Sequence, residues 1–426
     1  MNKRTKTALR RWCLYGWTLA KWTMAASAIG VVCGLIGTMF HFGVHEVTAF
    51  RGTHPWVLYL LPLAGFVIVS FYKLTETDGL GTDDIIDAVH EGKRLPILLL
   101  PAIFFGTVLT HLCGGSAGRE GAALQMGGTI GQCMGRTFRL DDRDLRVATL
   151  AGMAAFFSAL FGTPLAATVF AIMVISIGVI YHVALYPSLL AALVAYGVSI
   201  HLGVEPTRFT VVVPEQTVGL FVRVAALGVL CALVSILFCK LMHGAGHLMK
   251  RIKNPWLRVI CGGFAVIALT WVFGTDYNGA GMDIVTRAIE QETVAVPWAF
   301  LLKLVFTAVT LAAGFKGGEV VPSFFVGATF GCAVSPLLGL PVGFGAAVGL
   351  TAVFCGVTNC PVASTLLAVE LFGAEGMLYF ALACCLSYML SGYQGLYSSQ
   401  TILYSKLKAQ FINVHTNAYH AGEKTE

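Results

Sequence analysis

The chain has 426 residues, of which 57% are apolar and only 12% are charged. Soluble proteins carry about 25% charged residues, so this composition excludes an ordinary soluble protein. The net charge of +6 is too small and too scattered to indicate nucleic-acid binding. A membrane barrel would show short alternating strands, whereas the long uncharged segments of this chain predict an all-α, polytopic protein of the lipid bilayer.

The N-terminal segment, residues 1–22, is basic and contains no acidic residue. The positive-inside rule therefore predicts a cytoplasmic N-terminus. Within it, residues 7–21 are expected to form an amphipathic helix at the membrane surface, with tryptophans near the headgroups. The apolar segment that follows is too long for a signal peptide. The tail, residues 412–426, is expected to be cytoplasmic as well.

Uncharged segments cover much of the remaining chain. Three of them are near the roughly 20 residues that one crossing of the hydrocarbon core needs, namely 22–45, 52–72 and 95–118. Three longer ones must hold several helices joined by very short turns, namely 147–204, 320–369 and 376–405. Gly and Pro interrupt the longer segments, which predicts broken or reentrant helices rather than uniform spans.

An internal repeat relates the two halves of the chain. Residues 154–169 read AAFFSALFGTPLAATV, and residues 352–366 read AVFCGVTNCPVASTL, which aligns with one gap. We predict two membrane repeats, residues 23–205 and 206–411, the second ending in a helix that carries Tyr397. Paired broken helices in corresponding halves indicate a transport site near the membrane midplane. Chance similarity between Gly/Ala-rich helices is the alternative.

The same repeat aligns two glycine-rich turns. An offset of 199 positions places Gly118 on Gly317 and Glu120 on Glu319. An acidic residue in a charge-poor membrane segment indicates function, because a charge at the bilayer centre costs at least about 2.5 kcal/mol. A Gly-rich turn before a helix aims backbone N–H groups and the positive helix end at one point, which favours an anion. The Glu120 carboxylate could occupy such a site itself, and a permeating anion would displace it.

Each of these acids has a simpler interpretation. Glu120 could be an external loop acid paired with Arg119. Glu319 could cap a helix or pair with Lys316. A third glycine turn, 79–84, precedes a short amphipathic segment, and its Thr82 or Asp83 could be an N-cap. Three glycine turns that each begin a helix nevertheless favour one converging anion site.

Cysteine, histidine and serine patterns indicate neither a metal, nor a cofactor, nor an enzyme. The twelve cysteines form no CxxC pair and lie almost entirely in apolar segments, which predicts reduced, buried thiols. His41 and His45 have helical spacing but lack the HExxH pattern of a zinc helix. Residues 114–118, GGSAG, fit the G-x-S-x-G elbow of hydrolases, but they lie between membrane helices instead of after a strand.

From about residue 75 to 411, the chain resembles the CLC family of anion channels and anion/proton antiporters. Residues 118–121, GREG, resemble the family's glutamate-gate motif, and residues 79–82, GLGT, resemble its first anion-site turn. Residues 317–322, GGEVVP, resemble the third turn, and Tyr397 resembles the tyrosine whose hydroxyl faces the central ion. The resemblance implies a fold of two inverted-topology repeats and a homodimer with one ion pathway per subunit.

Departures from the chloride-handling members resemble the branch of the family that exchanges fluoride for protons. The first turn has Leu80, the gate motif is followed by Ala122 instead of Pro, and the third turn has Val320 instead of Phe. The helix after Pro164 carries no inner acid. The resemblance therefore implies F⁻ export coupled to H⁺ movement across the cell (inner) membrane. A chloride/proton antiporter or a passive chloride channel of the same fold is the alternative.

The resemblance also implies the roles of individual residues. Glu120 would be the gating glutamate, and Glu319 would supply the inner proton station. The anion site would be formed by residues from the three turns and the late tyrosine, namely Gly79, Leu80, Gly81, Thr82, Gly118, Arg119, Gly121, Gly318, Val320, Val321 and Tyr397. Crowding by the apolar members of this set would disfavour larger halides.

Overall fold

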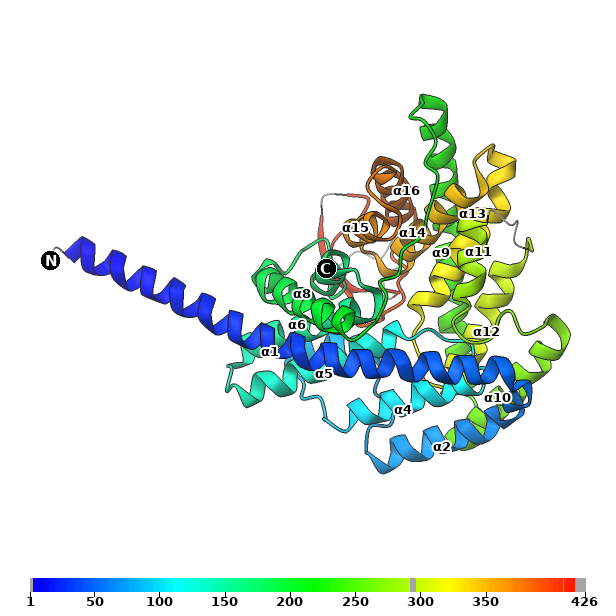
Figure 1. The fold of residues 1–426 in the computed structure, drawn as a ribbon, viewed down its shortest axis with the longest axis horizontal. Helices are drawn as coiled ribbons and strands as arrows, with labels where there is room; N and C mark the ends of the chain where they lie inside the picture. Colours follow the sequence, from blue (N-terminus) through cyan, green and yellow to red (C-terminus); the bar gives the residue numbers. More distant parts are fainter. Residues whose placement is uncertain (1–2, 292–295, 409, 418–426) are drawn as a thin grey trace.

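The computed structural model describes residues 3–291, 296–408 and 410–417, which form a nearly all-helical body (Figure 1). The first half of the chain contains α1 (Lys3–Thr53), the 3-10 helix η1 (Pro55–Leu60), α2 (Leu61–Leu74), α3 (Thr82–Glu91), α4 (Leu99–Leu112), α5 (Glu120–Thr137), α6 (Asp142–Phe161), α7 (Pro164–Met173), η2 (His182–Ala184) and α8 (Leu185–His201). The second half contains α9 (Val218–Met249), α10 (Pro255–Phe273), α11 (Met282–Glu290), α12 (Ala299–Ala313), α13 (Val320–Leu338), α14 (Val342–Thr358), α15 (Pro361–Phe372) and α16 (Met377–Leu390).

Among the described residues, seven helical segments are long and apolar enough to cross a membrane, and six further apolar helices are shorter. The chain is therefore a multi-pass membrane protein with broken helices, as expected. The short ones include α7 and α15, which begin at Pro164 and Pro361. The helix before each ends on a left-handed residue, Gly162 with φ 71° and Asn359 with φ 61°. Gly and Asn tolerate this conformation best, so both breaks follow from local chemistry.

The order of helices in the first half recurs in the second. α3 and α11 are both short, and α5–α6 and α13–α14 are both tightly packed hairpins. Glycines allow this packing, because a Cβ on Gly127 would lie 2.3 Å from the Gly152 oxygen, and one on Gly331 would lie 2.2 Å from the Gly345 oxygen. The predicted duplication is therefore present in the fold.

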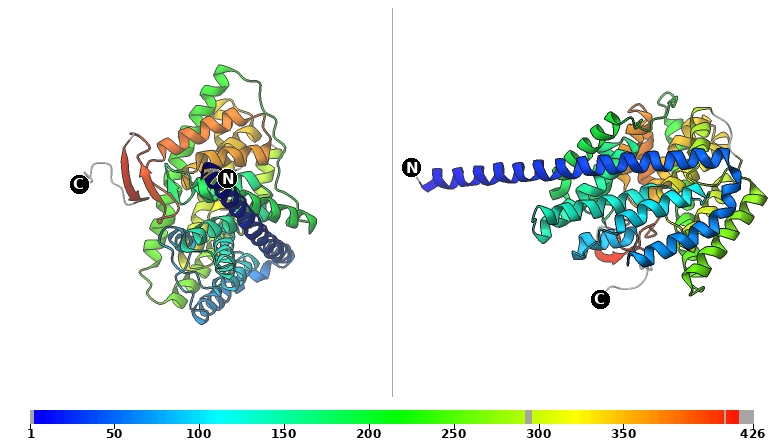
Figure 2. Two further views of the ribbon diagram at one scale, coloured as in Figure 1. Left: turned by 90° about the vertical axis from the view of Figure 1, so that its left-hand side faces the viewer. Right: turned by 60° about the horizontal axis from the view of Figure 1, so that its bottom comes forward.

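The N-terminal helix differs from the prediction. We expected a separate surface helix over residues 7–21, but α1 continues without a break to Thr53 and extends beyond the body of the molecule (Figures 1 and 2). Trp12, Tyr15 and Trp17 are exposed, whereas Trp22 is buried. Helical spacing places Thr18 and Lys21 on one side of this segment, so an amphipathic pattern is retained within the longer helix. The first contact with the body that involves charge is the ion pair of Lys21 with Asp144 on α6.

The C-terminal segment also differs from the prediction. α16 ends at Leu390, and Tyr397 lies in an irregular segment, not in a helix. A small sheet follows, in which β2 (Thr401–Tyr404) pairs in parallel with β1 (Ser176–Ile177) and antiparallel with β3 (Phe411–His415). Figure 2 shows these strands at the periphery of the helical body. The expected tail therefore begins within β3, and its residues 418–426 lie outside the described part.

Candidate ion site

Two glycine turns, one from each half of the chain, meet at the centre of the candidate site. The Gly118 N–H donates to the Gly318 oxygen at 2.7 Å, and the Gly318 N–H donates back to the Gly118 oxygen at 2.7 Å. A Cβ on Gly318 would lie 2.2 Å from the Gly121 nitrogen, so only glycine fits this position. The reciprocal pair relates the two turns by a local twofold arrangement, as expected for repeats of inverted topology.

The structure corrects the alignment of the two turns by one residue. The paired glycines, Gly118 and Gly318, are 200 positions apart, and α5 and α13 begin at Glu120 and Val320. Glu319 is therefore the counterpart of Arg119, since both are N-cap residues, and it is not the counterpart of Glu120. The sequence alignment matched identical residue types, whereas the fold matches backbone positions at the helix starts.

Glu120 is the first residue of α5, and its side chain is only 1% exposed. Its Oε2 accepts a hydrogen bond from the Arg119 backbone N–H at 2.9 Å. Its Oε1 has no hydrogen-bond partner within the described part of the chain, and the nearest cation, Arg119 Nε, lies 3.5 Å away. The pairing with Arg119 is therefore present, but Glu120 is not an acid of an open loop. Its carboxylate occupies the positive end of a helix.

Glu319 lies close to Glu120 without pairing with Lys316. It is the N-cap residue of α13, and a Cβ on Gly121 would lie 3.4 Å from its Oε2, which places the carboxylate at the start of α5. The Lys316 ammonium instead lies 4.0 Å from the centre of the Tyr72 ring. No ion pair joins Lys316 to Glu319 among the residues that the structure describes.

A cavity of about 260 Å³ brings the first turn, the third turn and Tyr397 together. It is lined by Gly79, Leu80, Gly81, Thr82, Asp83, Asp84, Gln125, Leu311, Phe315, Lys316, Gly317, Glu319, Leu396 and Tyr397. Of the predicted anion-site residues, the first turn and Tyr397 therefore share one space. Glu120 and Gly118 are buried beside this space rather than on its wall. Val320 and Val321 are buried too, and a Cβ on Gly118 would lie 3.0 Å from the Val321 Cβ.

The Tyr397 hydroxyl is buried and has no hydrogen-bond partner among the described residues. Its main chain is held firmly, because Thr416 Oγ1 donates to the Tyr397 oxygen at 2.6 Å. Two residues further on, the Ser399 N–H donates to Asp83 Oδ1 at 3.0 Å, which ties the tyrosine segment to the first turn. A fixed main chain with an unsatisfied hydroxyl is suited to donate to a bound anion.

The first turn is held by residues that sequence reasoning did not select. The N-cap of α3 is Gly81, not Thr82 or Asp83, and its N–H donates to Asp84 Oδ2 at 2.9 Å. Thr82 Oγ1 accepts from Gln125 Nε2 at 3.0 Å. Gln125 could have been noticed as the first polar side chain after Glu120 in a helix of small and apolar residues. The contact of Asp83 with Ser399 spans most of the chain and leaves no local signal.

The serine of the candidate hydrolase elbow makes only structural contacts. Ser116 is buried, its hydroxyl lies 3.0 Å from Thr307 Oγ1, and its N–H donates to Thr310 Oγ1 at 3.1 Å. It precedes a helix but follows no strand, so the geometry that exposes a nucleophilic serine is missing in this part of the structure. No group of three or more metal-ligating side chains occurs among the described residues.

Two helical repeats that meet through paired glycine turns beside a buried acid define a membrane protein of the ion channel and transporter class. Residues 63–392 match the family described as voltage gated chloride channel, and the chain belongs to this CLC family. The resemblance seen in the sequence is confirmed. Because this family consists of channels and transporters, the chain is not classed among enzymes.

One sequence relative and two solved structures show which members of the family this chain is similar to. A "chloride/fluoride channel protein" of Pseudomonas syringae pv. tomato is 39% identical over 400 residues, which cover 91% of this chain and 88% of the relative. The solved structure of a "CLC-type fluoride/proton antiporter" has a TM-score of 0.88 at 32% identity and covers 91% of this chain and 99% of that one. A slow cyanobacterial Cl⁻/H⁺ antiporter, at 18% identity and a TM-score of 0.75 over 87% of this chain and 94% of its own, shares the fold.

Proposed function

We propose that this chain is a fluoride/proton antiporter that exports F⁻ from the cytoplasm, with Glu120 as the gating glutamate. The observation that carries the proposal is the buried Glu120 carboxylate at the start of α5, beside the Gly118–Gly318 pair. A carboxylate at a helix start occupies a place that suits an anion. The names of the Pseudomonas relative and of the similar solved structure support fluoride as the anion.

The contacts of Glu120 suggest how one side chain couples two ions. Only Oε2 accepts a hydrogen bond, while Oε1 relies on the weaker approach of Arg119 Nε at 3.5 Å. Protonation removes the negative charge that both contacts favour, so the neutral side chain leaves the helix end and an anion takes its place. Glu319, whose carboxylate approaches Gly121, serves as the inner proton station. Each transport cycle then moves a proton on Glu120 against an anion.

Selectivity for fluoride is attributed to the donors and apolar side chains at the site itself, because the whole cavity of about 260 Å³ is far larger than either halide. Fluoride is small and strongly hydrated, so a site must replace its water with short N–H and O–H donors. The first turn supplies the Thr82 hydroxyl to the cavity, and Tyr397 supplies its hydroxyl, which has no partner among the described residues. Leu80 lies on the cavity wall, and Val320 and Val321 lie behind the paired glycines, so crowding of the ion by these apolar side chains would disfavour a larger halide.

The membrane placement and assembly are part of the same proposal. The basic N-terminus supports a cytoplasmic location for that end of the chain, and the same side of the inner membrane is proposed for the tail. Two sister helices, α7 and α15, lie side by side and expose Leu165 and Val362, each 48% exposed. This apolar surface, with one copy from each repeat, supports a homodimer with one ion pathway per subunit. Counting of photobleaching steps in liposomes tests it, and single steps throughout would contradict it.

A flux assay tests the central proposal. Purified protein in liposomes is followed with a fluoride electrode and a pH electrode at once. We expect F⁻ efflux to drive H⁺ uptake, with chloride moving far more slowly. Chloride that moves as fast as fluoride would indicate a chloride/proton antiporter instead, and fluoride movement without protons would indicate a channel.

A further inference from the structure

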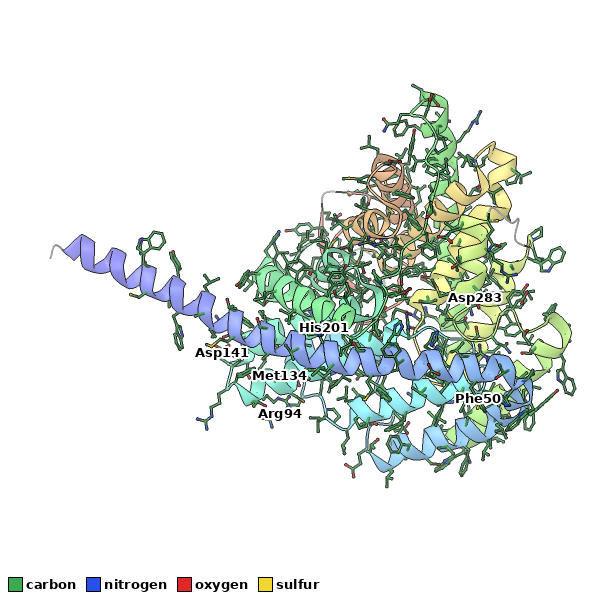
Figure 3. All side chains as sticks on the ribbon, viewed as in Figure 1. Phe50, Arg94, Met134, Asp141, His201 and Asp283 are labelled. Atoms are coloured by element: carbon green, nitrogen blue, oxygen red, sulfur yellow. The ribbon has the colours of Figure 1, made fainter. Side chains whose placement is uncertain are left out.

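His41 contacts the guanidinium that faces Glu120. In α1, the uncharged segment 22–45 is followed by Glu46. Phe50, which is labelled in Figure 3, lies near this end of the helix. His45 and Glu46 are exposed, with side chains 66% and 76% accessible. His41 lies one helical turn deeper, and its ring stacks parallel to that of His45 at 6.5 Å between centroids. Because the N-terminus of α1 is proposed to be cytoplasmic, His41 lies toward the external end.

The polarity of the contact fixes the protonation state of His41. Arg119 Nη1 lies 3.0 Å from His41 Nδ1. Arginine can only donate, so Nδ1 must accept with its lone pair and the ring must be neutral, with its proton on Nε2. A protonated ring would place a hydrogen on Nδ1 and a positive charge beside Arg119. The contact therefore exists only while His41 is neutral.

The same guanidinium connects His41 to Glu120. One of its nitrogens, Nη1, is held by His41, and another, Nε, lies 3.5 Å from Glu120 Oε1. The group is planar and rigid, so holding one nitrogen sets the direction of the others. Oε1 has no other hydrogen-bond partner in the described part of the chain. The approach of Arg119 to Glu120 therefore depends on an acceptor at position 41.

We infer that His41 is a positioning residue for Arg119 and makes the hold on Glu120 sensitive to external pH. Neutral His41 keeps the guanidinium facing the Glu120 carboxylate. Proton uptake by His41 at acidic pH removes the acceptor, and the guanidinium loses its orientation toward Oε1. This inference rests on the proposed role of Glu120 as the gate and adds a second titrating group to it.

Other titratable groups surround His41, and none replaces it. Arg119 lies between α4 and α5, and Glu120 begins α5. α4 contributes His111, whose Nδ1 contacts the Thr107 oxygen of its own helix. α8 ends at His201, labelled in Figure 3, and α1 itself adds His45 and Glu46. α6 packs against this part of α1 through Phe156 and Ala159 near Gly37. Among these groups, only His41 and Glu120 are recorded in side-chain contact with the Arg119 guanidinium.

Three substitutions at one position test the inference. H41A removes the acceptor, H41Q keeps an acceptor that does not titrate, and H41K mimics the protonated ring. Anion efflux from proteoliposomes is measured from about pH 8 to about pH 4, so that the range reaches the acidic pH at which a histidine beside a guanidinium takes up a proton. At about pH 7.5 we expect H41A and H41K to be faster by about tenfold, because losing one hydrogen bond to a charged group weakens the hold on Glu120. H41Q should stay close to the wild-type rate at about pH 7.5 and lack the wild-type change of rate at the acidic end of the range.

Controls separate positioning from structure and from the proposed function. H54Q removes a histidine at the same end of α1 that contacts Thr53 and Phe50 and not Arg119, and it should keep the wild-type pH profile. In the E120Q background, H41A should cause no further change of rate. H41Q that is as fast as H41A, or an additive change in E120Q, would overturn the inference. If the wild-type protein moves chloride instead of fluoride, the proposal of fluoride as the substrate is refuted. The comparison of the position 41 variants with wild type is then made with chloride and still tests the role of His41.

Discussion

The contact between Gly118 and Gly318 predicts that one added methyl group will disable the site. In G318A, the new Cβ would lie 2.2 Å from the Gly121 nitrogen and 2.9 Å from its Cα, against backbone that cannot move aside. The two turns must separate, which breaks both reciprocal hydrogen bonds. Overpacking costs about 1–3 kcal/mol, and each lost hydrogen bond costs about 1 kcal/mol. The expected destabilisation is therefore roughly 3–5 kcal/mol.

A matched glycine gives the opposite expectation. Gly197 lies within α8, and nothing is within 4 Å of the Cβ position. G197A should stabilise the protein by about 0.5–1 kcal/mol, because alanine favours the helix. Thermal unfolding in detergent is followed with a thiol-reactive dye, since most of the cysteines are buried. Anion flux is measured in parallel. G318A that unfolds at the wild-type temperature and transports normally would refute the contact between the two turns.

Three further substitutions address the chemistry of the site. E120Q should abolish proton-coupled exchange while the protein stays folded, because glutamine fills the same space without titrating; H⁺ uptake driven by F⁻ would contradict this. Y397F should leave thermal stability unchanged, since the Tyr397 hydroxyl has no partner among the described residues. It should raise the apparent KM for fluoride about fivefold, which is the effect of one lost neutral hydrogen bond. An unchanged KM would place the anion elsewhere. L80A should widen the cavity and raise the chloride flux relative to fluoride, whereas an unchanged ratio would remove Leu80 from the selectivity argument.

Local chemistry in the sequence determined the membrane segments, the helix breaks and the glycine turns. Uncharged segments of sufficient length predict spans because the hydrocarbon core excludes charge. The breaks at Pro164 and Pro361 follow from residues next to one another in the chain. These features need no information about distant contacts, and the fold contains most of them. Segment 95–118 is the exception, because its helix α4 belongs to the shorter apolar helices. The family resemblance was visible for the same reason, because its motifs are short turns.

Tertiary structure alone decided the register of the turns, the partners of the charges and the surroundings of Tyr397. The offset of 200 between Gly118 and Gly318 arises from backbone hydrogen bonds that residue types do not specify. Lys316 meets the ring of Tyr72, and Asp83 accepts from Ser399, across separations in the chain that no periodicity encodes. A hydrogen bond or an ion pair depends on positions within a few tenths of an ångström. The packing of whole helices sets those positions, and the sequence reveals only which groups are available.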